Sequence, residues 1–191
     1  MSYRACRDPD RGDGRTMERT LVIVKPDGVE RGLVGSVLAR FEATGLRIRQ
    51  LEMRVPSREI VSAHYPSDDA WLRTVGSKTL EDYASKNVDP ISKLGTSDSL
   101  EIGRRVKGWL VDFMSSGPVV VVVLEGNRSI DAVRKLVGAT LPVLAAPGTI
   151  RGDFSTDSPD LANDEQRPVR NLIHASGDAD EAEREIKLWF P

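Results

Sequence analysis

The chain contains little cysteine and little histidine. Of its 191 residues, one is cysteine and two are histidine. With Cys6 alone, the chain cannot form an internal disulfide or a metal site built from several cysteines. Neither sign of charge dominates, since 27 Lys and Arg residues face 29 Asp and Glu residues for a net charge of -2. That balance argues against nucleic-acid binding as the main role.

Long apolar runs are absent as well. The longest, PVVVVVL from Pro118 to Leu124, is far too short to cross a bilayer as a helix. The first residues lack the apolar core of a secretory signal peptide. A length of 191 residues with 39% hydrophobic residues suits one globular domain. Together these features predict a cytoplasmic protein.

Strand-like and helix-like segments alternate after residue 16. Runs of apolar and β-branched residues predict strands at 20–25, 46–55 and 118–126, with an irregularity in the second. Apolar residues at helical spacing predict helices at 33–45, 57–65, 101–117, 129–139 and 178–190. Ser57 and Ser129 are predicted to be N-caps of the second and fourth of these helices. This order of strands and helices predicts an α/β (α+β) fold of the ferredoxin-like βαββαβ type.

Three stretches do not follow this pattern. Residues 1–16 are charged and lack periodicity, so we expect a disordered extension before a single domain at 17–191. Residues 66–103 contain one weak helical segment at 78–87 and are predicted to be an insertion packed on the outside of the domain. Residues 156–167 form part of a polar stretch that we interpret as a second inserted loop.

His174 lies near the end of the chain, in the stretch VRNLIHASGD. In an extended segment, Leu172 and His174 would share one face and Ile173 the other. Asp178 suits the N-cap of the helix that follows. His174 is therefore expected where a strand ends and a turn begins. Taken alone, it is interpreted as a hydrogen-bonded structural histidine.

Several cationic or hydroxyl side chains occupy strand ends, helix ends and turns. Lys25 ends a predicted strand, Arg134 lies on a helix with Thr140 just beyond it, and Arg151 lies in a tight, turn-rich loop. Each of them alone is most simply a solvated surface residue. Together they are typical of a phosphate site, because phosphoryl transfer needs positive charge around the moving group.

The chemistry also needs a nucleophile. No glycine-rich loop ending in Gly-Lys-Ser/Thr is present, so a kinase of this sequence would hold phosphate by other means. A neutral imidazole is a competent nucleophile near neutral pH, and His174 could carry a phosphoryl group covalently. Glu185, on the last predicted helix, is the candidate carboxylate to orient it.

These residues stand in motifs that resemble the nucleoside diphosphate kinase family. The resemblance runs from Glu18 to Phe190 apart from the two inserted stretches, and five motifs follow the family's order: ERTLVIVKPDGVERGLVG, SGPVVVVVLEG, PGTIRGDF, RNLIHAS and AEREIKLWF. It implies a ferredoxin-like sandwich with a four-stranded antiparallel sheet. It also implies transfer of the terminal phosphate from a nucleoside triphosphate to a nucleoside diphosphate by a ping-pong route. Members use Mg²⁺ that arrives on the nucleotide, and they assemble as homo-oligomers, usually hexamers or tetramers built from dimers.

The resemblance assigns roles residue by residue. His174 matches the histidine that is phosphorylated, and Lys25 matches the lysine that contacts the transferring phosphate and the sugar. The residues that match the phosphate-binding set are Arg134, Thr140 and Arg151. Asn171 matches the residue that hydrogen-bonds a ribose hydroxyl. The residues that match those surrounding and orienting the histidine are Tyr65, Ser176 and Glu185.

The sequence departs from the family in two respects that bear on the site. The family's residue that stacks on the base falls within the longer stretch here, which leaves Trp71, Val106 and Trp109 as candidates. After the histidine, members commonly read Gly-Ser-Asp-Ser, whereas this chain reads Ala-Ser-Gly-Asp, with the acid one position later. We expect no direct protein ligand to the metal, with Asp178 assisting the hydrated ion through water.

Two other functional classes compete with the enzyme. One is a non-catalytic, nucleotide-binding interaction protein on the same fold. A dead relative would be expected to lose the histidine or a phosphate residue, whereas this chain keeps them all, so the enzyme is favoured. The other is DNA binding, which the near-neutral charge disfavours as a main role.

Overall fold

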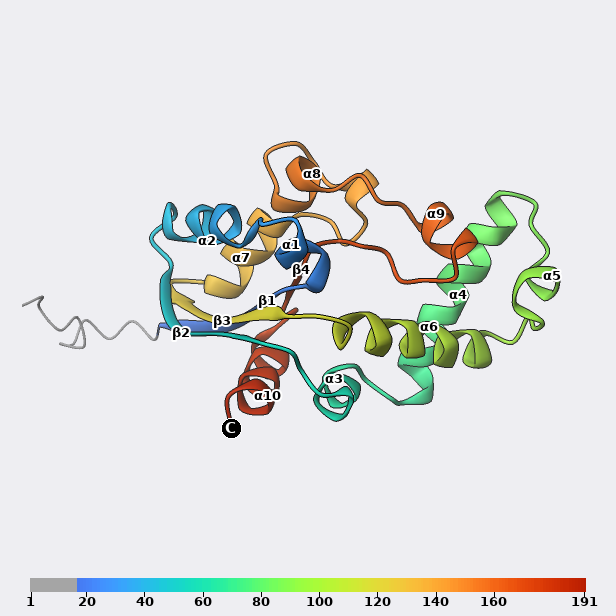
Figure 1. The fold of residues 1–191 in the computed structure, drawn as a ribbon, viewed down its shortest axis with the longest axis horizontal. Helices are drawn as coiled ribbons and strands as arrows, with labels where there is room; N and C mark the ends of the chain where they lie inside the picture. The colour runs from blue at the N-terminus through green and yellow to red at the C-terminus, as the bar shows by residue number, and fades with distance from the viewer. Residues whose placement is uncertain (1–16) are drawn as a thin grey trace, which may run out of the picture.

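The computed structural model describes residues 17–191, so the extension predicted at residues 1–16 lies outside the described part of the chain. Figure 1 shows the elements in chain order. The strands are β1 (Glu18–Val24), β2 (Arg47–Arg54), β3 (Val119–Gly126) and β4 (Ile173–Ala175). The helices are α1 (Pro26–Glu30), α2 (Val34–Glu42), α3 (Arg58–His64), α4 (Asp69–Ser85), α5 (Pro90–Leu94), α6 (Ser99–Met114), α7 (Ser129–Val137), the short 3-10 helix η1 (Pro142–Leu144), α8 (Ile150–Phe154), α9 (Pro159–Asp164) and α10 (Ala179–Trp189).

The strands form one four-stranded sheet in the order β2-β3-β1-β4. Every neighbouring pair is antiparallel. Helix α2 leads from β1 to β2 and α7 leads from β3 toward β4, which is the βαββαβ order. The predicted ferredoxin-like fold is therefore confirmed. None of the helices in the described part of the chain is both long enough and apolar enough to cross a bilayer.

Helices cover both faces of the sheet (Figure 1). Alternate residues of β1 and β3 point to opposite faces, so each strand is buried on two sides. One face packs against α2 and α7, and its strand residues are Val22, Val24, Val120, Val122 and Leu124. The other packs against α3, α6 and α10, and its strand residues are Leu21, Ile23, Val119, Val121 and Val123. The valine run predicted to be a central strand therefore lies in the middle of the sheet.

The structure confirms two of the three predicted helix caps, Ser57 and Asp178, and corrects the third. Ser57 caps α3, since its side chain accepts a hydrogen bond from the backbone N–H of Ile60. Ser129 does not cap α7: it is the first helical residue, and its Oγ donates to the Glu18 carbonyl at 2.8 Å. The Glu18 carboxylate accepts from the backbone N–H of Ile130 at 2.9 Å instead. A partner from β1 has thus replaced the local serine cap, which sequence spacing alone does not reveal.

The first inserted stretch is far more helical than its sequence pattern indicates. Instead of one weak segment at 78–87, α4 runs from Asp69 to Ser85 and packs along α6. Glycines allow the closest approach: a Cβ on Gly76 would lie 1.8 Å from the Ser99 carbonyl oxygen, and one on Gly103 would lie 2.0 Å from that of Leu72. Apolar side chains pack only farther along the two helices, so the helical periodicity is weak.

The second inserted stretch is not a simple polar loop. It contains α9, which packs against α4 of the first insertion (Figure 1). The hydroxyl of Tyr83 donates to the Asn163 carbonyl at 3.3 Å, and the Asn163 amide donates to the Asp82 carboxylate at 2.7 Å. The two inserted stretches therefore lie together at one end of the sheet.

The strand that carries His174 is shorter than expected. Leu172 has a φ of +67°, and the Ile173 N–H bonds back to the Asn171 carbonyl at 2.8 Å in a tight turn. The alternation predicted for Leu172 and His174 is therefore wrong, and Leu172 joins Ile173 in the same core cluster. The turn is held because the Leu172 N–H donates to the Asp27 carboxylate and its carbonyl accepts from the Lys25 N–H. These partners come from the far end of the sequence.

Candidate active site

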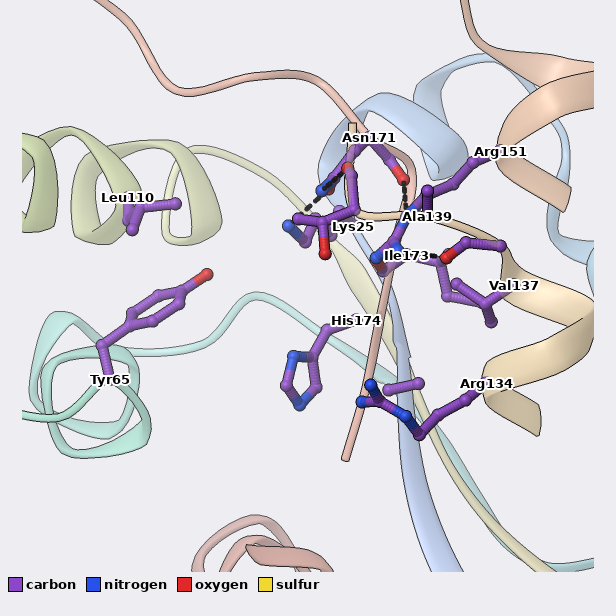
Figure 2. Close-up of a pocket in the computed structure, with 13 residues that line it drawn as sticks. Lys25, Tyr65, Leu110, Arg134, Val137, Ala139, Arg151, Asn171, Ile173 and His174 are labelled. Carbon is purple, nitrogen blue, oxygen red and sulfur yellow. Dashed lines mark hydrogen bonds between the residues drawn. The ribbon is translucent and has the colours of Figure 1, made fainter. Parts of the chain in front are cut away.

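A cavity of about 340 Å³ opens beside the end of β1, the strand β4 and the C-terminal end of α7. Figure 2 shows the side chains that line it. The structure brings together seven of the residues predicted for the site, which are Lys25, Tyr65, Arg134, Thr140, Arg151, Asn171 and His174. Ser176 and Glu185 do not line the cavity but lie behind His174, bonded to it or to each other.

Lys25 follows β1 directly and precedes α1. It is 6% exposed, and its ammonium donates to the side-chain oxygen of Asn171 at 2.7 Å. Burial, with a smaller contribution from the nearby Arg151 guanidinium, lowers the pKa of Lys25 to about 8. At neutral pH the ammonium is therefore mostly charged, but it is easily neutralised.

Asn171 links two parts of the cavity wall. Its amide oxygen accepts from Lys25, and its amide nitrogen donates to the Thr140 carbonyl at 2.9 Å. The residue is 5% exposed. It thereby ties the end of β1 to the segment that follows α7, and its side chain has both ends engaged.

Arg151 does not lie in a loop, as predicted, but in the short helix α8, which Thr149 caps. Its guanidinium donates to three backbone carbonyls: Gly138 at 2.9 Å, Ile173 at 2.6 Å and Asn171 at 3.2 Å. Burial lowers the pKa of Arg151 to about 10, which still leaves it charged at neutral pH. The guanidinium therefore supplies charge to the cavity while joining three segments of backbone.

Arg134 reaches the cavity from the last turn of α7. In Figure 2 its guanidinium points toward His174. It makes no hydrogen bond to any residue in the described part of the chain, unlike Arg151. Its donors are therefore open to an anionic ligand in the cavity.

His174 lies on β4, opposite Ile23 of β1. Its side chain is 19% exposed, and Nε2 lies 2.9 Å from Oε2 of Glu185. Burial, followed by the positive charge of Lys25, lowers the pKa of His174 well below its usual range. The imidazole is therefore neutral, and the carboxylate partner places its proton on Nε2. Nδ1 is left unprotonated, and in Figure 2 it lies on the side of Lys25 and Tyr65.

A buried polar cluster supports the histidine from behind. Glu185, on α10, is fully buried, and its Oε2 also accepts from the Ser176 hydroxyl at 2.8 Å. Ser176 in turn accepts the backbone N–H of Leu21 at 3.2 Å. Burial raises the pKa of Glu185, while His64 and the Ser176 hydrogen bond oppose that rise. The carboxylate that orients His174 is thus itself held by β1 and β4.

Tyr65 closes the cavity on the side of α3. Its ring faces the space in front of His174 in Figure 2, and burial raises the pKa of its hydroxyl, which stays protonated. Oη has no hydrogen-bond partner among the described residues. Lys107 of α6 donates to the Tyr65 carbonyl at 3.1 Å and so helps to fix it. The hydroxyl is a free donor that faces the cavity.

Sequence reasoning missed two residues of this region. His64 is buried beside Glu185, with its Nδ1 3.3 Å from Oε1 of that carboxylate. The sequence did indicate that His64 could be buried near the site, because it precedes Tyr65 and lies three residues after the apolar Val61 of the same helix. The second missed residue is Leu110 of α6, which lines the cavity.

The residues predicted to stack on the base do not line this cavity. Trp109 lines a separate cavity and packs with Val106 against the first insertion. The centroid of the Trp71 ring lies 6.4 Å from that of Tyr65.

The donor groups determine which metal this site suits. One cluster of histidine and carboxylate ligands is compact among residues 17–191, namely His64, His174 and Glu185. Its nitrogen-rich donor set is poorly matched to Mg²⁺, which prefers oxygen. The cavity lining contains no Asp or Glu. Asp178 uses Oδ1 to cap α10 through the Glu181 N–H. The residues present therefore fit Mg²⁺ only as a companion of bound phosphates.

Comparison with known proteins agrees with this geometry. The family model described as nucleoside diphosphate kinase matches residues 18–71 and 103–191, which leaves most of the first inserted stretch unmatched. A nucleoside diphosphate kinase of Pyrobaculum aerophilum is 55% identical over 174 residues, which is 91% of this chain and 95% of the relative. One of Mycobacterium tuberculosis is 39% identical over 175 residues, covering 91% of this chain and 97% of the relative.

Solved structures give the same result. The crystal structure of an NDP kinase from Pyrobaculum aerophilum superposes with a TM-score of 0.90 at 52% identity, covering 92% of this chain and 97% of that one. A transition-state mimic of the Borrelia burgdorferi enzyme, with bound vanadate and ADP, superposes with a TM-score of 0.71 at 38% identity, covering 92% of this chain and 88% of that one. On sequence, fold and cavity alike, this chain belongs to the nucleoside diphosphate kinase family.

Proposed function

We propose that this chain transfers the terminal phosphoryl group of a nucleoside triphosphate, typically ATP, to a nucleoside diphosphate, with His174 as the covalent carrier. The observation that carries the proposal is the state of His174. Its imidazole is neutral, its Nε2 is held by Glu185, and its other nitrogen lies at a cavity lined by Lys25, Arg134 and Arg151. An aligned, unprotonated nitrogen beside positive charge is what phosphoryl transfer to histidine requires.

The reaction balances in two half-steps. The lone pair of Nδ1 forms a bond to the γ-phosphorus, the bond to the bridging oxygen breaks, and that electron pair leaves with the nucleoside diphosphate. The proton on Nε2 stays on the ring and faces Glu185 throughout. A terminal oxygen of an incoming nucleoside diphosphate then attacks the same phosphorus and releases His174. No net proton transfer is needed, which suits a cavity whose lining contains no free carboxylate.

The cationic side chains stabilise charge as the phosphoryl group moves. Arg134 has open donors near His174, Lys25 lies at the other side of the cavity, and Arg151 adds charge between them. Thr140 and Asn171 contribute polar groups on the wall where phosphates and sugar would lie. Mg²⁺ bound with the nucleotide would neutralise part of the phosphate charge. The assistance of Asp178 through water stays a prediction.

Broad tolerance for the base is expected. The polar and cationic groups that line the cavity are suited to phosphate and ribose, which all nucleotides share. ATP mixed with GDP, CDP, UDP or dTDP should yield each triphosphate, with kcat/KM values within about 100-fold of one another. Chromatographic separation of the products checks this. A single accepted base, or no transfer at all, would contradict the proposal.

Nucleotide affinity is expected to fall as the pH rises through about 8. The pKa of Lys25 is lowered to about 8 in the free protein, so the ammonium that attracts phosphate is present below that pH and lost above it. Calorimetric titration with ADP from about pH 7 to about pH 9.5 measures the effect. Lys25→Met should bind more weakly at neutral pH and lack this step. An unchanged profile in the unmodified protein would refute the role of Lys25.

We also propose that the protein acts in the cytoplasm as a homo-oligomer, a hexamer or tetramer built from dimers. β2 is an edge strand of the sheet, and its Leu51 and Met53 are 48% and 56% exposed. Val143 and Leu144 form a second exposed apolar site on η1. Such surfaces are usually covered by another subunit. The native mass in solution measures this directly.

The domain organisation proposed is one unit at 17–191 with two insertions. The contacts between α4 and α9 support a shared role for them at the rim of the nucleotide cleft or at a subunit contact. From α9 the chain continues to Asn171 through Arg167, which pairs with Asp157 at 2.7 Å. The insertions therefore connect through the backbone to the cavity wall.

A further inference from the structure

His64, the other histidine of the chain, lies directly behind His174. His64 ends α3, is 2% exposed, and meets His174 edge to face with ring centroids 4.5 Å apart. Its Nδ1 lies 3.3 Å from Oε1 of Glu185. The indole nitrogen of Trp189 also lies 3.3 Å from this Nδ1 and donates to it. One ring nitrogen therefore meets an acceptor and a donor at the same distance.

The carboxylate of Glu185 is satisfied on one oxygen only. Oε2 receives His174 and the Ser176 hydroxyl. Oε1 is buried and has no hydrogen-bond partner among the described residues, and its nearest cation, Arg184, is 3.6 Å away. A buried carboxylate oxygen without a donor is costly, so a group able to supply a proton there matters to the orientation of the whole side chain.

His64 can supply that proton in one of its two neutral tautomers. In the structure Nδ1 accepts from Trp189, which corresponds to the proton on Nε2, and Oε1 of Glu185 receives no hydrogen bond. With the proton on Nδ1 instead, His64 would donate to Oε1. An ionised Glu185 favours this second tautomer, because the donor then faces a negative charge. The same nitrogen thus adjusts to the charge of the carboxylate that orients the reactive ring.

We propose that His64 is a positioning residue for phosphoryl transfer: it donates from Nδ1 to Oε1 of Glu185 and so keeps Oε2 on the ring of His174. This inference rests on the proposed function, since it assumes that His174 carries the phosphoryl group. His64 is not itself among the residues that line the cavity, although its ring packs against two that are, His174 and Tyr65. Its proposed effect on the orientation of His174 runs through Glu185.

The proposal has a consequence for pH dependence. Burial raises the pKa of Glu185. A hydrogen bond donated by neutral His64 to Oε1 favours the ionised carboxylate and opposes that rise. Without His64 that pKa rises further, so Glu185 is protonated, and His174 loses its anionic partner, at higher pH. The charged or titratable groups that act on this cluster from the surrounding elements are Lys25, Tyr65, Arg151, His174, Asp178, Glu181 and Arg184.

The experiment compares His64→Phe with His64→Asn. Phenylalanine fills the space but has no donor, whereas the asparagine amide nitrogen can occupy the position of Nδ1. Trp189→Phe is the matched control, because it removes the other partner of Nδ1 and leaves Glu185 untouched. Rapid-quench phosphorylation by ATP and Mg²⁺ without an acceptor is measured across pH, and ADP affinity is measured by calorimetry.

The expected result separates chemistry from binding. His64→Phe should phosphorylate roughly 10- to 100-fold more slowly, with its acid limb moved to higher pH and its ADP affinity unchanged. His64→Asn and Trp189→Phe should stay close to the unmodified protein. A His64→Phe rate and pH profile equal to those of the unmodified protein would overturn the role. So would equal losses of rate and ADP affinity in both His64 variants, which would indicate packing. Absence of phosphorylation in the unmodified protein would instead refute the proposed function.

Discussion

Replacing His174 by alanine should reduce phosphoryl transfer by roughly 10⁴-fold or more, since it removes the atom that forms the covalent intermediate. The cationic wall of the cavity remains, because Lys25, Arg134 and Arg151 do not depend on the imidazole for their positions. Nucleotide affinity should therefore change little. Steady-state transfer from ATP to GDP and calorimetric binding of ADP measure the two effects.

Two controls make the result specific. His174→Gln places an amide nitrogen where Nε2 lies and so can keep a hydrogen bond to Glu185, yet it offers no nucleophile and should be equally inactive. Lys187→Ala, on the exposed side of α10 with a side chain that is 74% exposed, should keep full activity. A His174→Ala protein that retained a tenth of the activity would rule out the covalent route.

Exchange of Arg151 for lysine should damage both stability and activity. The guanidinium fork donates to the carbonyls of Gly138, Ile173 and Asn171, and a single ammonium cannot serve three carbonyls that lie in different directions. A buried carbonyl left without a donor costs about 1–3 kcal/mol, so we expect a loss of about 2–5 kcal/mol in the free energy of unfolding. kcat/KM should fall by about 100-fold as the phosphate site loosens.

Arg134 provides the matched comparison. It lines the same cavity but makes no hydrogen bond to residues 17–191, so Arg134→Lys should lower activity while leaving the melting temperature close to that of the unmodified protein. Thermal unfolding of both variants separates the two roles. If Arg151→Lys melted within about 2 °C of the unmodified protein, the three carbonyl bonds would contribute little to the fold.

The central part of the fold could be predicted because its sequence signals are local. The valine run of β3 reports burial on both faces, and the helices with apolar stripes report which side faces the sheet. Helix α4 could not be assigned in full, since Gly76 and Gly103 occupy its closest contacts with α6 and so shorten the apolar stripe. The helix in the second insertion could not be predicted for a related reason. Helix α9 is stabilised by hydrogen bonds to residues of α4 that are distant in the sequence.

The site also contains features that the sequence predicts and features that arise only from tertiary packing. The residues that carry the chemistry could be identified because each stands in a recognisable motif. The positive φ of Leu172 could not be predicted, because it depends on Asp27 and Lys25, which lie at the opposite end of the sequence. The carbonyl contacts of Arg151 and the place of His64 behind Glu185 likewise arise only when β4, α8, α3 and α10 pack together.

Covalent labelling tests the central claim most directly. The unmodified protein, incubated with γ-labelled ATP and Mg²⁺ and no acceptor, should take up about one phosphoryl group per chain on His174. The label should be lost in acid, survive in base, and leave as labelled GTP when GDP is added. Protein that binds ADP yet takes up no label would contradict the account, because the neutral, carboxylate-held imidazole at the cavity would then not be the carrier.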